Sequence, residues 1–144
     1  MINGAGGGAG SFAIQIAKSL GAVITGVDNG EKLDMMRSIG AEHVIDYTKK
    51  DFTKNGQTYD FILDFMAYHS FFDYKRALNP KGIYVVVGGS TIFQTVLLGL
   101  LISIVSGKKM GLLLHKPNKD LDSLIKLIEE GKVKPIIDKV YPLS

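Results

Sequence analysis

A glycine-rich turn near the start of the chain has the composition of a phosphate-binding loop. Residues 3–10 (Asn-Gly-Ala-Gly-Gly-Gly-Ala-Gly) contain five glycines and lead into a predicted helix over Ser11–Leu20. Glycine lets the backbone approach phosphates closely, and a helix N-terminus offers free N–H groups to an anion. Strict Gly-x-Gly-x-x-Gly spacing fails in every frame; the workable frame is Ala5-x-Gly7-x-x-Gly10. Unless it is only a flexible turn, we predict that pyrophosphate binds over Ala5, Gly6, Gly7, Gly8, Ala9 and Gly10.

An acidic residue follows the turn at the spacing of a ribose-binding carboxylate. Asp28 follows the predicted strand Val23–Val27 and lies 18 residues after Gly10. Its carboxylate can accept hydrogen bonds from an adenosine ribose and would repel a 2′-phosphate, which favours NAD over NADP. Asn29 completes this part of the predicted site. The composition of Asp28-Asn29-Gly30 also suits a plain turn, which stays open as the alternative.

Other nucleotide-binding motifs fit the sequence less well. A Walker loop requires Gly-Lys-Ser/Thr, and neither Gly-Lys pair is followed by Ser or Thr. No tyrosine has a lysine four residues later, as a short-chain dehydrogenase requires. A methyltransferase that uses Gly6-x-Gly8-x-Gly10 and Asp28 to bind S-adenosylmethionine stays open. Its usual acidic residue just before the glycines is absent from this chain.

Short apolar runs alternate along the chain with segments of helical periodicity. The predicted strands are Val23–Val27, His43–Asp46, Phe61–Asp64 and Ile83–Val87. The predicted helices lie at Ser11–Leu20, Leu33–Ile39, Tyr68–Leu78 and Leu121–Ile128. This alternation predicts an α/β fold, a doubly wound parallel Rossmann sheet in a three-layer α/β/α arrangement. Only Met1–Asn3 precede the glycine turn, so we expect the first strand to be truncated.

Length and composition limit the class of protein. The 144 residues suit one domain over residues 1–144, and 46% apolar with 22% charged residues is a globular composition. The chain has no cysteine and three widely spaced histidines, so we predict no metal site. A net charge of +3 is too small to indicate nucleic acid. The longest apolar stretch, 96–105, is too short to span a membrane, and we expect a cytoplasmic protein.

The glycine turn belongs to a longer pattern that resembles a known superfamily. Its parts are Ile2–Gly10, Ala13-x-Gln15-x-Ala17-Lys18-x-x-Gly21-Ala22, Ser38–Ala41, His43–Tyr47, Tyr59-Asp60-x-Ile62-x-Asp64, Arg76-Ala77-Leu78-x-Pro80-x-Gly82, Val87–Gly89 and Gly131-Lys132-Val133-x-Pro135-x-Ile137-Asp138. Together they resemble the medium-chain dehydrogenase/reductase superfamily, most nearly its zeta-crystallin-like quinone oxidoreductase branch. The resemblance covers essentially the whole chain.

The resemblance implies a nicotinamide dinucleotide as cofactor, NADP or NAD. Lys32 and Tyr47 match positions that contact the adenosine 2′-phosphate in NADPH-dependent members, whereas Asp28 departs from the small or hydroxyl residue usual there. The sequence therefore points both ways on the cofactor. Without a 2′-phosphate, Lys32 is a solvated lysine and Tyr47 a tyrosine at the edge of the core. The strand ends that line the nicotinamide half match Ala67, Gly88 and Gly89.

The resemblance also implies parts that this chain lacks. Family members carry a substrate domain before the glycine turn, and that domain builds most of the substrate pocket. No catalytic residue is therefore carried over, and members of this branch use no zinc. The segments Gly111–His115 and Ile136–Val140 match strands that extend the sheet and pair subunits, which implies a homodimer. We expect the apolar segment 92–105 to pack as a helix, not as a membrane anchor.

These observations predict the cofactor-binding domain of an NAD(P)H-dependent oxidoreductase. The resemblance implies hydride transfer to a quinone, an enone or a similar carbonyl compound, a small-molecule substrate of the full-length enzyme. We expect this chain alone to be inactive, because it lacks the substrate domain. A non-catalytic nucleotide-binding or regulatory module is the first alternative, and a methyltransferase that uses S-adenosylmethionine is the second.

Overall fold

The computed structural model describes residues 1–87, 108–113 and 119–142. Within these ranges, six strands form one parallel sheet in the order β3-β2-β1-β4-β5-β6. The strands are β1 (Ile2–Asn3), β2 (Thr25–Asp28), β3 (His43–Asp46), β4 (Tyr59–Asp64), β5 (Leu78–Val86) and β6 (Lys109–Leu112). The predicted doubly wound α/β fold is confirmed, because the chain fills one half of the sheet and then crosses to the other.

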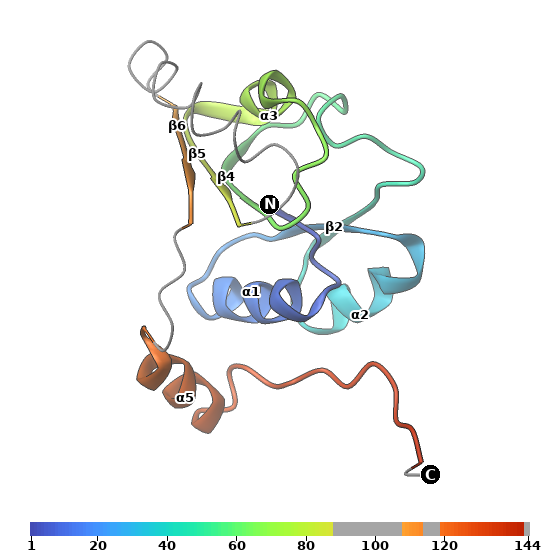
Figure 1. Ribbon diagram of the computed structural model, residues 1–144, viewed down its shortest axis with the longest axis vertical. Coiled ribbons are helices and arrows are strands. Elements are labelled where there is room, and N and C mark those ends of the chain that lie inside the picture. The colour runs from blue at the N-terminus through green and yellow to red at the C-terminus, as the bar shows by residue number, and fades with distance from the viewer. Residues whose placement is uncertain (88–107, 114–118, 143–144) are drawn as a thin grey trace.

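Helices cover both faces of the sheet. They are α1 (Gly8–Ser19), α2 (Leu33–Ser38), preceded by the short 3₁₀ turn η1 (Gly30–Lys32), α3 (Phe71–Ala77) and α5 (Leu121–Glu129). Figure 1 shows α1 and α2 together on one side of the strands and α3 on the other. The three layers are those expected for a Rossmann domain.

Each face of the sheet has its own apolar core. On the α1 and α2 face, Ile2 packs in a cluster with the fully buried Ile14 and Met36. On the α3 face, Val27 packs in a cluster with the fully buried Tyr84. Successive residues of a strand point to opposite faces, so even a short strand contributes to both cores.

Strand β1 is only two residues long, as expected, and lies at the centre of the sheet. Ile2 pairs with Gly26 of β2 and Leu63 of β4, and Asn3 pairs with Val27 and Asp64. The carboxyl end of β1 therefore delivers the glycine turn to the point where the strand order reverses. This is where open α/β sheets bind ligands.

Several predicted boundaries differ from the structure. Helix α1 begins at Gly8, inside the glycine turn, and its N-cap residue Gly7 makes no side-chain cap hydrogen bond. Helix α3 begins at Phe71, after a capping box between Ser70 and Asp73, and not at Tyr68. Strand β3 has the predicted bounds, whereas β6 begins two residues before the predicted Gly111.

The strand expected at Ile136–Val140 is wrong. These residues form no strand, and the chain just before them is held by a side chain of α1: both backbone groups of Lys134 bond to the amide of Gln15. In Figure 1 the red C-terminal segment accordingly runs past α1 and α2 and away from the sheet. No helix among the described residues is long and apolar enough to cross a membrane. The segment 92–105 lies outside the described residues.

Candidate functional site

A cavity of about 640 Å³ opens beside the glycine turn at the carboxyl ends of β1 and β2. Four parts of the chain meet there: the glycine turn with the start of α1, the end of β2 with η1 and the start of α2, Met66 after β4, and the C-terminal segment at residues 136–138. A second cavity of about 630 Å³ lies at the amino ends of the strands and includes none of the predicted site residues. The first cavity is therefore the candidate site.

Backbone hydrogen bonds fix the shape of the turn. The N–H groups of Gly4 and Ala5 both donate to the carbonyl oxygen of Val27, at 3.0 and 3.1 Å. Gly4 has φ +80°, a left-handed conformation that favours glycine, whereas Ala5 is completely buried. The tight turn is thus made by Gly4, which lies outside the predicted motif Ala5-x-Gly7-x-x-Gly10. The Asn3-Gly4 pair, a common turn dipeptide, is the signal that could have found it.

The glycines after this turn divide into packed and open positions. A Cβ at Gly10 would lie 2.2 Å from the carbonyl oxygen of Gly4, and one at Gly6 would lie 2.6 Å from Cβ of Lys32. At Gly7 the nearest atom would be 3.5 Å away, and at Gly8 none lies within 4 Å. Gly10 and Gly6 therefore allow close packing, and Gly7 and Gly8 leave space at the cavity.

The same open positions form the N-terminus of α1. Gly7 is the N-cap residue and provides no side-chain cap, and the first turn carries no acidic residue. Ala9 is exposed on that turn, and Gly10 is buried beneath it. Backbone N–H groups and the positive end of the helix dipole thus face the cavity without a competing carboxylate on the first turn, which suits an anion.

The Asp28 carboxylate ties the glycine turn to the end of β2. Its Oδ2 accepts a hydrogen bond from the N–H of Gly6 at 2.8 Å, and its Oδ1 accepts one from the N–H of Asn29 at 2.8 Å. A carboxylate has about four acceptor sites, so lone pairs remain for ligand hydroxyls. Asp28 lines the cavity, as a ribose-binding residue must.

Lys32 also lines the cavity and is paired with a distant carboxylate. Its Nζ lies 2.5 Å from Oδ1 of Asp138. The hydrogen bond and charge of Asp138 raise the pKa of Lys32, and those of Lys32 lower the pKa of Asp138. Both groups are therefore charged at neutral pH. Sequence reasoning missed Asp138, because 106 residues separate it from Lys32 and no local pattern links them.

The other predicted residues lie at various distances from the cavity wall. Tyr47 is 57% exposed and does not line the cavity, and its backbone N–H donates to the carbonyl of Asp28. Asn29 is next to the wall, and its side-chain oxygen is buried without a hydrogen-bond partner among the described residues. Ala67 is completely buried, and its neighbour Met66 lines the cavity in its place. Gly88 and Gly89 lie outside the described residues.

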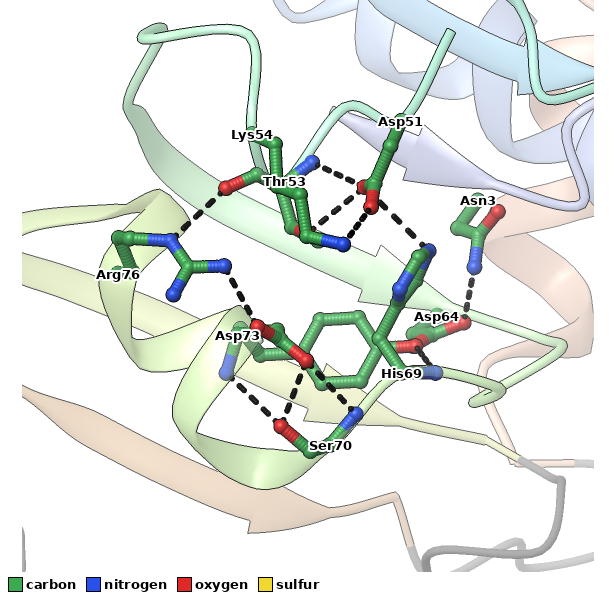
Figure 2. Close-up of polar contacts among 10 residues, drawn as sticks. Asn3, Asp51, Thr53, Lys54, Asp64, His69, Ser70, Asp73 and Arg76 are labelled. Carbon is green, nitrogen blue, oxygen red and sulfur yellow. Dashed lines mark hydrogen bonds and ion pairs between the residues drawn. The ribbon is translucent and has the colours of Figure 1, made fainter. Parts of the chain in front are cut away.

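A buried carboxylate supports the strand end on the Met66 side of the cavity (Figure 2). Asp64 Oδ1 accepts hydrogen bonds from Asn3 Nδ2 at 2.9 Å and from the backbone N–H groups of Met66 and Ala67 at 3.0 and 2.8 Å. Its Oδ2 accepts one from the Tyr84 hydroxyl at 3.0 Å. One side chain thus joins β1, β5 and the turn after β4, and holds Ala67 at φ +47°.

The described residues do not form a metal site. No group of three or more histidine, aspartate or glutamate side chains in this part of the chain is arranged to hold an ion, and the sequence has no cysteine. They therefore do not supply the donor set that zinc requires.

Comparison with known proteins relates this geometry to a family. The sequence profile of zinc-binding dehydrogenases matches residues 39–144. A trans-enoyl reductase of Aspergillus terreus is 30% identical, in an alignment that covers 99% of the chain and 44% of that protein. An NAD-dependent alcohol dehydrogenase of Sulfolobus acidocaldarius is 35% identical, covering 100% and 43%. The chain thus spans less than half the length of these curated relatives.

The fold comparison agrees with the sequence comparison. The solved structure of the quinone oxidoreductase from Coxiella burnetii superimposes with a TM-score of 0.73 and 26% identity, covering 95% of this chain and 43% of that one. The share of that structure that is matched is close to the shares of the two curated relatives.

Proposed function

The chain belongs to the zinc-binding dehydrogenase family, and we propose that it is the cofactor-binding half of an NAD(P)H-dependent oxidoreductase. The resemblance of its motifs to the medium-chain dehydrogenase/reductases is confirmed by that match and by the quinone oxidoreductase fold. The observation that carries the proposal is the cavity in which the open glycines at the start of α1 and the Asp28 carboxylate meet.

The residues present fit a dinucleotide. Gly7 and Gly8 would let the pyrophosphate approach, since no side chain obstructs it there, and the N–H of Gly8 at the start of α1 would donate to it. Asp28 would accept hydrogen bonds from the adenosine ribose with its remaining lone pairs. The turn after β4, held by Asp64, would support the nicotinamide half. The bound cofactor supplies hydride transfer, and these residues supply its position.

The substrate belongs to the proposal as well. Relatives named as an enoyl reductase and a quinone oxidoreductase favour a quinone, an enone or a similar carbonyl compound as hydride acceptor. We assign no catalytic residue to this chain and no zinc ligand to its described residues. A homodimer through the outer edge of β6, the last strand of the described sheet, is also a proposal; sedimentation equilibrium tests it.

Titration of the ¹⁵N-labelled chain by NMR tests the proposed cofactor. NADH or NADPH should shift the amide signals of Gly6, Gly7, Gly8 and Asp28, and S-adenosylmethionine should leave them unchanged. Shifts caused by S-adenosylmethionine alone would instead favour the methyltransferase. If none of the three ligands shifts these signals, the proposal is wrong. We expect no oxidation of NADH or NADPH by a quinone or an enone with this chain alone, and turnover would contradict that expectation.

A further inference from the structure

The C-terminal segment is anchored to the domain just before it lines the candidate site. Val133 is completely buried, and Lys134 is held by two hydrogen bonds with the Gln15 side chain: Lys134 N–H to Oε1 at 2.8 Å, and Nε2 to the Lys134 carbonyl at 2.9 Å. Gln15 itself is buried in α1. The path of the segment is therefore set by the core of the domain before it reaches the cavity.

Beyond this anchor, the segment contributes directly to the cavity wall. Ile136, Ile137 and Asp138 line the same space as the glycine turn. Asp138 meets Lys32 at 2.5 Å, and this is the contact that joins the segment to the start of α2. The Lys32 side chain is only 32% exposed, so few other directions are open to its ammonium group.

The charges around this contact disfavour a further anion. The described residues that line the cavity include three carboxylates, Asp28, Glu31 and Asp138, and one ammonium group, that of Lys32. Asp138 already neutralises that ammonium group. A ribose 2′-phosphate carries between one and two negative charges at neutral pH, so it must displace Asp138 before it can pair with Lys32.

We propose that Asp138 is a specificity-determining residue, which occupies Lys32 and thereby makes the site favour NAD(H) over NADP(H). This inference rests on the proposed function and names the cofactor class for the same site. NADH has two ribose hydroxyls in this position and leaves the Lys32–Asp138 pair intact. The 2′-phosphate of NADPH can pair with Lys32 only if the Lys32–Asp138 pair separates and residues 136–138 move away from the cavity.

Dissociation constants for NADH and NADPH, measured by NMR titration of the ¹⁵N-labelled chain, test this inference. Asp138→Asn should lower the ratio of the NADPH constant to the NADH constant about threefold, the size expected for an exposed ion pair. This lowering of the ratio should be smaller at high salt, because salt screens the charges. In the unmodified chain, NADPH should shift the amide signals of residues 136–138 more than NADH does.

Two further variants make the test specific. Asp122→Asn removes one exposed carboxylate from α5 and should leave the ratio unchanged. In a Lys32→Gln background, Asp138→Asn should also leave it unchanged, because the two residues act as a pair. If Asp138→Asn raised the affinities for NADH and NADPH equally, or left the ratio unchanged, the specificity role of Asp138 would be overturned and the proposed function would still stand. Absence of binding by either dinucleotide in every variant would overturn the proposed function together with this inference.

Discussion

The carbonyl oxygen of Gly4 occupies the place that a side chain at Gly10 would need. A Cβ on Gly10 would lie 2.2 Å from that oxygen and 2.7 Å from Cα of Ala5. The first turn of α1 therefore rests directly on the backbone of the glycine turn. This contact sets the position of the helix N-terminus, and with it the N–H group of Gly8 at the cavity.

Gly10→Ala should destabilise the domain. The obstructing atoms are backbone atoms of the glycine turn, which is itself hydrogen-bonded to the end of β2, so relief requires α1 to move. Overpacking of this kind costs about 1–3 kcal/mol, and we expect the upper part of that range. Urea unfolding followed by circular dichroism measures the change in the free energy of unfolding.

Gly8→Ala is the matched control for this substitution. A Cβ there meets no atom within 4 Å, and alanine is the better helix former by about 0.5–1 kcal/mol. This variant should be at least as stable as the unmodified chain, although its methyl group should weaken dinucleotide binding by obstructing the pyrophosphate. Equal destabilisation by the two substitutions would contradict the packing role of Gly10.

Local patterns predicted the sheet and most of its helices. The apolar run His43–Asp46 became β3 with no change of bounds, and Asn79-Pro80 ended α3 at Ala77 as proline chemistry requires. The start of α3 was misplaced because its capping box pairs Ser70 with an aspartate at Asp73, not with the Glu or Gln of the usual pattern. Such boundaries depend on one or two side chains.

Long-range contacts explain what the sequence could not predict in the site. The resemblance supplied Lys32, but its partner Asp138 comes from a segment that we expected to extend the sheet. That segment forms no strand, and the Gln15 side chain holds the backbone N–H and carbonyl of Lys134 just before it. No spacing rule links residues more than 100 positions apart, so this wall of the cavity follows from tertiary structure alone.

Asp28→Asn should weaken both the turn and cofactor binding. The two carboxylate oxygens accept from the N–H groups of Gly6 and Asn29, and an amide nitrogen would leave one of those donors unpaired. We expect a loss of about 1–2 kcal/mol in stability and about tenfold in NADH affinity. Thermal unfolding and isothermal titration calorimetry measure the two effects.

Asp34→Asn provides the comparison for Asp28. Asp34 lies on α2, its side chain is 97% exposed, and it pairs with Arg37 on the same helix. Its replacement removes the same charge close to the site, yet should leave NADH affinity unchanged. If Asp28→Asn binds NADH as well as Asp34→Asn does, Asp28 does not contact the ribose.

Tyr84→Phe should cost about 1.5–2 kcal/mol of stability. The hydroxyl of this fully buried side chain donates to Asp64 Oδ2 at 3.0 Å. A hydrogen bond to a carboxylate stabilises a fold more than a hydrogen bond between neutral groups does. The ring stacks on Tyr74 with centroids 4.5 Å apart, and phenylalanine keeps that contact. Tyr68→Phe, which removes a hydroxyl from an exposed ring, should be neutral in the same urea titration. Equal stability of the two variants would show that Asp64 does not need the Tyr84 hydroxyl.

The Asp51 carboxylate should make the domain lose stability in acid (Figure 2). Partial burial by itself raises the pKa of Asp51, but hydrogen bonds from the hydroxyl and N–H of Thr53, together with Lys54 and the nearby His69, outweigh it and hold the pKa at about 2. The unfolded chain has the ordinary value of 3.8. The stabilisation is therefore complete above about pH 4 and is lost as the pH falls towards 2.

Asp51→Asn isolates this contribution from those of other carboxylates. Its unfolding free energy should fall less between pH 5 and pH 2 than that of the unmodified chain, by about 1–2 kcal/mol after allowance for solvent screening. Asp122→Asn, which removes an exposed carboxylate on α5, should follow the unmodified chain across the range. Guanidinium unfolding at several pH values provides the curves. If the Asp51→Asn curve runs parallel to that of the unmodified chain, the hydrogen bonds to Asp51 do not stabilise its ionised form.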